Sequence, residues 1–210
     1  MEIIIFIPIL FFSIILHEFA HGFVAYRLGD DTAYYSGRLT LNPLAHVDWV
    51  GTIGVPLLCY LTGMPMFGWA KPVPVNPMRL PSPRKDMGKV AVAGPLVNLG
   101  LAIVFVCLLK LVWMGRGILP LQTAQNLFVF LQYGIIVNVM LALFNLIPIV
   151  PLDGGRIVTA LLPVRTAVIY DRFFSRWGMW LVVGLILTGA MRYVLLPPVA
   201  VVMGLLNKVL

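Results

Sequence analysis

The stretch IIIFIPILFFSIILHEFAHGFVAY, residues 3–26, is apolar apart from three titratable residues near its end, His17, Glu18 and His21. A membrane-spanning helix needs about 20 mostly apolar residues, so the stretch is long enough to cross a bilayer. It lacks the basic n-region and the small-residue cleavage site of a secretory signal peptide. The stretch therefore predicts a retained transmembrane helix.

The whole chain shares this apolar character. Of its 210 residues, 60% are hydrophobic and 11% are charged, and its mean hydropathy is +0.98. A soluble domain has about 25% charged residues, and one of this size has too little interior to bury so much apolar surface. The composition excludes a soluble globular enzyme, a disordered chain and a nucleic-acid-binding domain. We attribute the net charge of +7 to basic residues in cytoplasmic loops.

Further apolar stretches predict additional transmembrane helices. They cover about 88–114, 127–147 and 177–193, with a short one at 199–210 after the pair Pro197-Pro198. The apolar run over 49–61 is shorter and contains glycine and proline, which predicts a re-entrant or interfacial element.

Two segments between the first two long spans have a β-like pattern. Residues 36–42 alternate polar and apolar side chains, as in a short strand. Residues 71–77 are proline-rich and extended, as in an edge strand or a polyproline stretch. The predicted fold class is an all-α polytopic membrane protein. It has about four to five transmembrane helices and a small membrane-associated β or re-entrant element between the first two long spans.

The basic residues predict the orientation in the membrane. Lysine and arginine are concentrated in 27–89 and 151–176, whereas the loop between the second and third spans contains Arg116 alone. The positive-inside rule assigns both basic segments to the cytoplasm and the N-terminus to the outside. This orientation puts His17 and His21 toward the cytoplasmic end of the first span.

The residues His17-Glu18-Phe19-Ala20-His21 fit the pattern H-E-x-x-H on a helix. Residues four apart lie on one helix face, so two imidazoles can bind one Zn²⁺, and Glu18 can act as general base to a zinc-bound water. An ionised side chain at the bilayer centre costs on the order of 3 kcal/mol, and metal binding compensates for this cost. The alternative is a helix-end cluster whose polar groups reach the interface.

A third metal ligand can be sought by elimination. The other glutamate, Glu2, lies at the opposite end of the same helix, and position 27 is arginine instead of a third histidine. His46, the aspartates and the two cysteines remain. Asp153 is the best candidate, because it follows the third span where two prolines break the helix. An ordinary cytoplasmic turn at Asp153 and a ligand role for His46 are the alternatives.

These motifs resemble the site-2 protease family of intramembrane zinc metalloproteases. The matching stretches are HEFAH at 17–21, AGPLVN at 93–98 and NLIPIVPLDGG at 145–155. The stretches GRLTLNPLAH at 37–46 and GWAKPVPVN at 68–76 are similar to the short bacterial and archaeal branch. The resemblance is to the short form of the family, for which we expect no span before the H-E-x-x-H helix and no PDZ or CBS domain.

The resemblance implies roles for five residues. His17, His21 and Asp153 are expected to bind one Zn²⁺ per chain, with Glu18 as the catalytic base. Asn145 is expected near the substrate carbonyl.

Further candidates are less specific. Asn145 either bridges helices or stabilises the oxyanion at the scissile carbonyl. Asn98 either bridges helices or orders a ligand or loop near the zinc. Asn138 is assigned to packing. His46 is either a rival third ligand or a loop residue near the active-site mouth.

The predicted function is that of an intramembrane zinc endopeptidase. It is expected to hydrolyse peptide bonds in or near transmembrane segments of single-pass membrane proteins, as in regulated intramembrane proteolysis. The expected partners are the substrate helix and the lipid bilayer, without nucleic acid. The expected location is a prokaryotic plasma membrane, crossed several times, with the active site toward the cytoplasm.

One domain is expected over 1–210, with a catalytic core at about 1–160 and C-terminal helices at about 161–210. The strand-like segments 36–42 and 71–77 are expected to pair with an unwound substrate. A metal transporter is disfavoured because the polar residues cluster at one depth. A non-catalytic binding protein is disfavoured because metal binding alone does not need Glu18.

Overall fold

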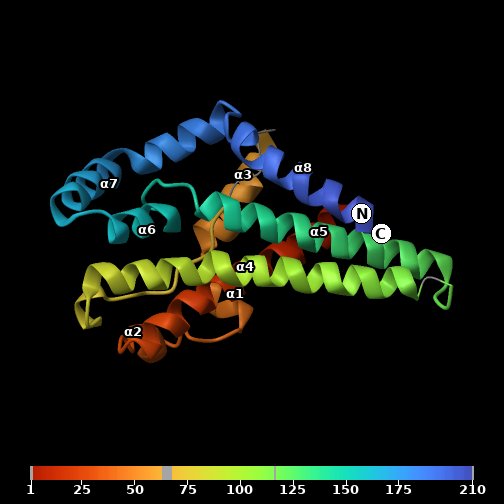
Figure 1. Cartoon of the computed structure of the whole chain (residues 1–210), viewed down its shortest axis with the longest axis horizontal. Helices are drawn as coiled ribbons and strands as arrows, with labels where there is room; N and C mark the ends of the chain where they lie inside the picture. The colour runs from red at the N-terminus through yellow and green to blue at the C-terminus, as the bar shows by residue number, and fades with distance from the viewer. Residues whose placement is uncertain (1, 63–67, 116, 210) are drawn as a thin grey trace.

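A computed structural model describes residues 2–62, 68–115 and 117–209 of the chain. All regular structure within these residues is helical (Figure 1). The long helices are α1 (Glu2–Arg27), α4 (Pro83–Met114), α5 (Leu121–Asn145), α7 (Val164–Leu187) and α8 (Met191–Val209). The short ones are α2 (Thr32–Tyr35), η1 (Pro43–His46), η2 (Trp49–Gly54), α3 (Val55–Thr62), η3 (Pro77–Arg79) and α6 (Asp153–Leu161).

Helices α1, α4 and α5 form the centre of the molecule (Figure 1). Helix α4 packs against α1, α5 and α6, and α1 also contacts α5. One glycine brings α4 and α5 close together: a Cβ on Gly134 would lie 2.5 Å from a ring carbon of Phe105. Around this contact lies an apolar cluster that consists of Ala102, Leu109, Leu131, Ile135, Val139 and Val199.

Three helices are long and apolar enough to cross a membrane, namely Phe6–Arg27 within α1, α4 and α5. They correspond to the first three predicted spans. Helices α7 and α8 meet the same criterion only as a pair, with a bend of 69° between them, as in a broken span or a re-entrant loop. The described residues thus contain three candidate spans, or four if the bent pair is one span. The predicted all-α polytopic fold class is confirmed.

The position of the last helix break was predicted wrongly. The break lies at residues 188–190, where Gly189 has a φ of +70°, whereas we expected it at Pro197-Pro198. Both prolines lie inside α8. Interior proline removes one N–H donor and clashes with the preceding turn, which can kink a helix without ending it, whereas a left-handed glycine is a common end to a helix. The glycine therefore marks the boundary.

The strand predicted over 36–42 is also wrong, because this segment consists of turns and irregular backbone. Gly37 has a φ of +64°, which turns the chain. The carbonyl of Thr40 is bonded to Nε2 of the His46 ring at 2.8 Å. A side chain thus takes the place that a neighbouring strand would occupy.

Residues 71–76 have no regular secondary structure, Asn76 has an extended backbone, and η3 follows directly. They form no ladder with any described segment, and proline has no N–H to contribute to one. The buried Arg38 side chain donates from Nη2 to the carbonyls of Lys71 at 2.5 Å and Pro72 at 3.3 Å. A guanidinium group therefore holds this irregular segment in place.

The element predicted over 49–61 is helical. It consists of the π-helix η2 followed directly by α3. The carboxylate of Asp48 caps its start by accepting the N–H groups of Val50 at 3.0 Å and Gly51 at 2.7 Å. Its helical length of at most about 21 Å, at 1.5 Å per residue, is shorter than the bilayer core of about 30 Å.

Candidate metal site

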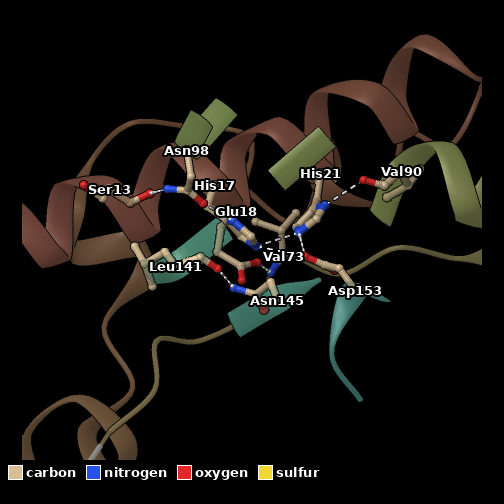
Figure 2. A network of polar contacts seen from close by, with 10 residues as sticks. All are labelled: Ser13, His17, Glu18, His21, Val73, Val90, Asn98, Leu141, Asn145 and Asp153. Atoms are coloured by element: carbon tan, nitrogen blue, oxygen red, sulfur yellow. Dashed lines mark hydrogen bonds and ion pairs between the residues drawn. The ribbon is translucent and has the colours of Figure 1, made fainter. Parts of the chain in front are cut away.

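His17, His21 and Asp153 converge at the junction of α1 and α6, and we call these three residues the metal triad (Figure 2). The Nε2 atoms of the two histidines are 3.0 Å apart. Oδ2 of Asp153 lies 3.1 Å from Nε2 of His17 and 3.2 Å from Nε2 of His21. All three ligand atoms lie within 4.8 Å of one another. The structure thus brings together the three residues that we predicted as ligands.

The chain between α5 and α6 carries Asp153 into the site. Two glycines directly after Asp153 allow this loop to fold back tightly. A Cβ on Gly154 would collide with the carbonyl oxygens of Leu146 and Ile147, and one on Gly155 would lie 2.6 Å from the Ile149 carbonyl carbon. The backbone therefore closes on itself and presents Asp153 in the first turn of α6, where a carboxylate is favoured by the helix dipole.

The hydrogen bonds of the histidine rings determine which nitrogen faces the site. Nδ1 of His21 lies 2.7 Å from the carbonyl oxygen of Val90, which can only accept, so Nδ1 carries the proton. Nδ1 of His17 lies 2.6 Å from Oδ1 of Asn98. An amide oxygen can only accept, so this Nδ1 also carries the proton. In the neutral rings, both Nε2 lone pairs then point at each other and at the Asp153 carboxylate (Figure 2).

Three converging lone pairs fit a cation. Oδ2 of Asp153 is buried and has no hydrogen-bond partner. Two imidazoles and one carboxylate are one of the ligand sets found in catalytic zinc sites, which keep a fourth position open.

Glu18 is held by the segment 71–76 next to the triad. Its half-buried carboxylate accepts the N–H of Val73 through Oε2 at 2.8 Å. Because residues 71–73 are anchored by Arg38, this bond orients Glu18 from outside its own helix. Figure 2 shows the Glu18 carboxylate and the Val73 amide joined in this way.

The other predicted residues have separate partners. Asn145 is the last residue of α5, and its Nδ2 donates to the Leu141 carbonyl at 3.0 Å. His46 is fully buried in η1, where it bonds to Thr40. Among the described residues, His46 does not belong to the group that can share a metal ion with His17 and His21. Its geometry is that of a residue that holds the loop together.

Several contacts could not be foreseen from residue types. The Val90 carbonyl and the Val73 amide are backbone groups, and such groups have no sequence signal. Ser13 lies one turn before His17 on the same face of α1, and a polar residue at that spacing in an apolar helix is a usable signal. Asn138, which we assigned to packing, bonds to both Ser13 and Asn98.

Comparison with known proteins identifies similar sequences. Residues 116–188 match the model of "Peptidase family M50". "Putative zinc metalloprotease YwhC" of Bacillus subtilis is 44% identical over 151 residues, which are 72% of this chain and 66% of that protein. "Putative zinc metalloprotease Rip2" of Mycolicibacterium smegmatis is 31% identical over 186 residues, which are 86% of this chain and 65% of that protein.

A more distant relative is "Zinc metalloprotease MJ0392" of Methanocaldococcus jannaschii. It is 27% identical over 154 residues, which are 73% of this chain and 33% of that protein. The chain thus spans just under two thirds, or less, of the length of these relatives. No solved structure gives a significant match. The matched family and the names of these relatives agree with the resemblance found in the sequence, and the chain belongs to peptidase family M50, the site-2 protease family.

Proposed function

We propose that the protein is a zinc metalloendopeptidase that hydrolyses peptide bonds in or near transmembrane segments of single-pass membrane proteins, in regulated intramembrane proteolysis. The proposal rests on one observation: three converging metal-binding atoms lie at the end of an apolar helix, next to Glu18. Membership of family M50 and the names of the relatives support the same reaction.

In this proposal the metal triad holds the zinc ion. When bound, zinc polarises the scissile carbonyl and lowers the pKa of a water to about 7. Asn98 and the Val90 carbonyl keep the Nε2 atoms of His17 and His21 unprotonated and directed at the ion.

Glu18 is the proposed general base. Its carboxylate takes a proton from the attacking water and then passes that proton to the leaving amine nitrogen. The bond to the Val73 N–H engages one carboxylate oxygen and orients the group. The second oxygen is available to accept the proton.

Asn145 is proposed to bind the substrate carbonyl oxygen. Its side-chain amide has two N–H donors, and the Leu141 carbonyl engages its nitrogen. One N–H can serve this bond while the other stabilises the developing oxyanion.

The substrate must be extended before it can be cut, because a transmembrane helix satisfies its peptide groups internally. Residues 71–76 are proline-rich, have no regular secondary structure and contact Glu18 through Val73. We therefore propose that they align an unwound substrate segment by backbone pairing.

The proposed setting is a prokaryotic plasma membrane, with the site toward the cytoplasm. The density of lysine and arginine in 27–89 and 151–176 supports this orientation. It puts the C-terminal end of α1 and the start of α6 on the same side of the bilayer.

The test uses the purified full chain in liposomes with a panel of single-pass transmembrane substrates. Cleavage is expected with zinc, is lost on adding a zinc chelator, and returns when zinc is restored. Zinc flux into the liposomes without cleavage of any substrate would contradict the proposal and favour a transporter.

A further inference from the structure

A buried polar network connects three helices behind the metal triad. It consists of Ser13 from α1, Asn98 from α4 and Asn138 from α5, and all three residues are fully buried. Buried polar groups are costly in apolar surroundings unless each is hydrogen-bonded. Figure 2 shows Ser13 and Asn98 leading to His17. The network therefore ends at a proposed zinc ligand.

The orientation of the Asn138 amide is determined by its own helix. Its Nδ2 lies 2.9 Å from the Gly134 carbonyl oxygen and 2.9 Å from Oγ of Ser13. A carbonyl can only accept, so the NH₂ group of Asn138 must face it. Oδ1 of Asn138 consequently faces α4.

The side-chain amide of Asn98 is oriented in turn by Asn138. Its Nδ2 donates to Oδ1 of Asn138 at 3.0 Å and to the Ser13 carbonyl at 3.4 Å. Oδ1 of Asn98 is thereby directed to Nδ1 of His17 at 2.6 Å. If the Asn98 amide were reversed, an NH₂ group would face Nδ1, and the neutral imidazole would carry its proton on Nε2.

The two histidines differ in what determines their tautomer. His21 is oriented by the backbone carbonyl of Val90, which no substitution removes. His17 depends on the Asn98 side chain, which is oriented by the Asn138 amide at 3.0 Å and, more weakly, by the Ser13 carbonyl at 3.4 Å. If the Asn98 amide loses its orientation, the tautomer of His17 should change, whereas the tautomer of His21 should stay the same.

We propose that Asn138, supported by Ser13, is a positioning residue for metal binding: it orients Asn98 and thereby keeps Nε2 of His17 free to bind the ion. This inference rests on the proposed metal site. It extends that site to a residue on α5 that does not touch the metal triad itself.

The test measures the zinc dissociation constant by competition with a chromophoric chelator, on the folded, monodisperse fraction of each full-length variant. We expect Asn138→Leu to weaken zinc binding about tenfold, the lower end of the effect typical of outer-shell changes. The matched control is Asn126→Leu, because Asn126 lies in the same helix but is exposed. This control is expected to leave the zinc dissociation constant unchanged. If Asn138→Leu does not fold, Asn138→Ser replaces it, because a hydroxyl at Cβ is too short to reach Asn98.

A second substitution separates positioning from a merely structural role. Both oxygens of an aspartate can accept the hydrogen bond from Nδ1 of His17. Asn98→Asp therefore presents an acceptor to His17 in either orientation of its side chain, whether or not Asn138 is present. In the Asn138→Leu background, Asn98→Asp is expected to restore most of the lost zinc affinity. A structural role would instead lower the melting temperature of the metal-free protein, with an unchanged dissociation constant and no effect of Asn98→Asp on it.

Two failures are distinguishable. If the wild type binds zinc through His17 and His21 but Asn138→Leu and Asn138→Ser bind it equally well, the positioning role is overturned and the metal site stands. If substitution of His17 or His21 leaves zinc binding of the wild type unchanged, the proposed function itself is wrong.

Discussion

Gly94 of α4 lies directly against His17 of α1. A Cβ on Gly94 would stand 2.5 Å from Cε1 and 2.6 Å from Nε2 of His17, and 2.6 Å from Cε1 of His21. Helix α4 therefore forms one wall of the metal site through its backbone. The same helix orients both rings, through the Val90 carbonyl and the Asn98 side chain.

Gly94→Ala is expected to weaken zinc binding at least about tenfold, comparable to the loss of an outer-shell contact, because the methyl group displaces both imidazoles. In a helix interior, alanine is otherwise favoured over glycine by up to about 1 kcal/mol. The matched control is Gly100→Ala on the same helix, where a Cβ meets no atom within 4 Å. Zinc content and melting temperature are measured for both variants. Equal zinc binding by Gly94→Ala and the control would show that the rings can move aside.

Glu18→Gln is expected to lower the cleavage rate about 10²- to 10⁴-fold, the range typical of general acid–base catalysis. Glutamine keeps the size of the side chain and can still accept the Val73 N–H through its carbonyl oxygen. Zinc content should therefore match the wild type. Cleavage assays in liposomes and metal analysis of the same sample check both parts. Full activity in this variant refutes the role of Glu18.

Asp153→Asn is expected to weaken zinc binding by more than about 100-fold. Changes in outer-shell residues typically weaken it about 10- to 100-fold, and Asp153 is a proposed ligand. The substitution removes the anionic ligand from a site that otherwise has two neutral imidazoles. Asp171→Asn, an exposed aspartate on α7, serves as the control for loss of one negative charge. Chelator competition measures both. A dissociation constant that is the same for the two variants contradicts a ligand role for Asp153.

Val73→Pro is expected to reduce cleavage at least about tenfold and to leave zinc binding unchanged. Proline removes the N–H that Glu18 accepts, and a hydrogen bond to a charged group contributes about 1.5–3 kcal/mol. Val75→Pro introduces proline at the next position of the same strand-like register, without touching that bond. Cleavage rates are compared at equal zinc content. If Val75→Pro impairs cleavage as much as Val73→Pro, the effect belongs to the whole segment and the specific role of the Val73 amide is wrong.

The apolar spans and the H-E-x-x-H helix were predictable because their signals are local. Span length follows from the run of apolar residues, and the shared face of His17 and His21 follows from spacing on one helix. Asp153 was predictable by elimination, since few carboxylates exist in the chain. The helix break at Gly189 was not, because one glycine has no strong signal beside a proline pair.

The sequence alone indicates which chemical groups are available: two imidazoles on one helix face, one adjacent glutamate and one aspartate after a broken span. Only the packing of α1, α4, α5 and α6 decides how these groups are oriented. The Val90 carbonyl, the Val73 amide and the space at Gly94 are backbone features whose effect depends on which helices lie together. A residue-type pattern cannot encode them, because every residue but proline has the same backbone donor and acceptor.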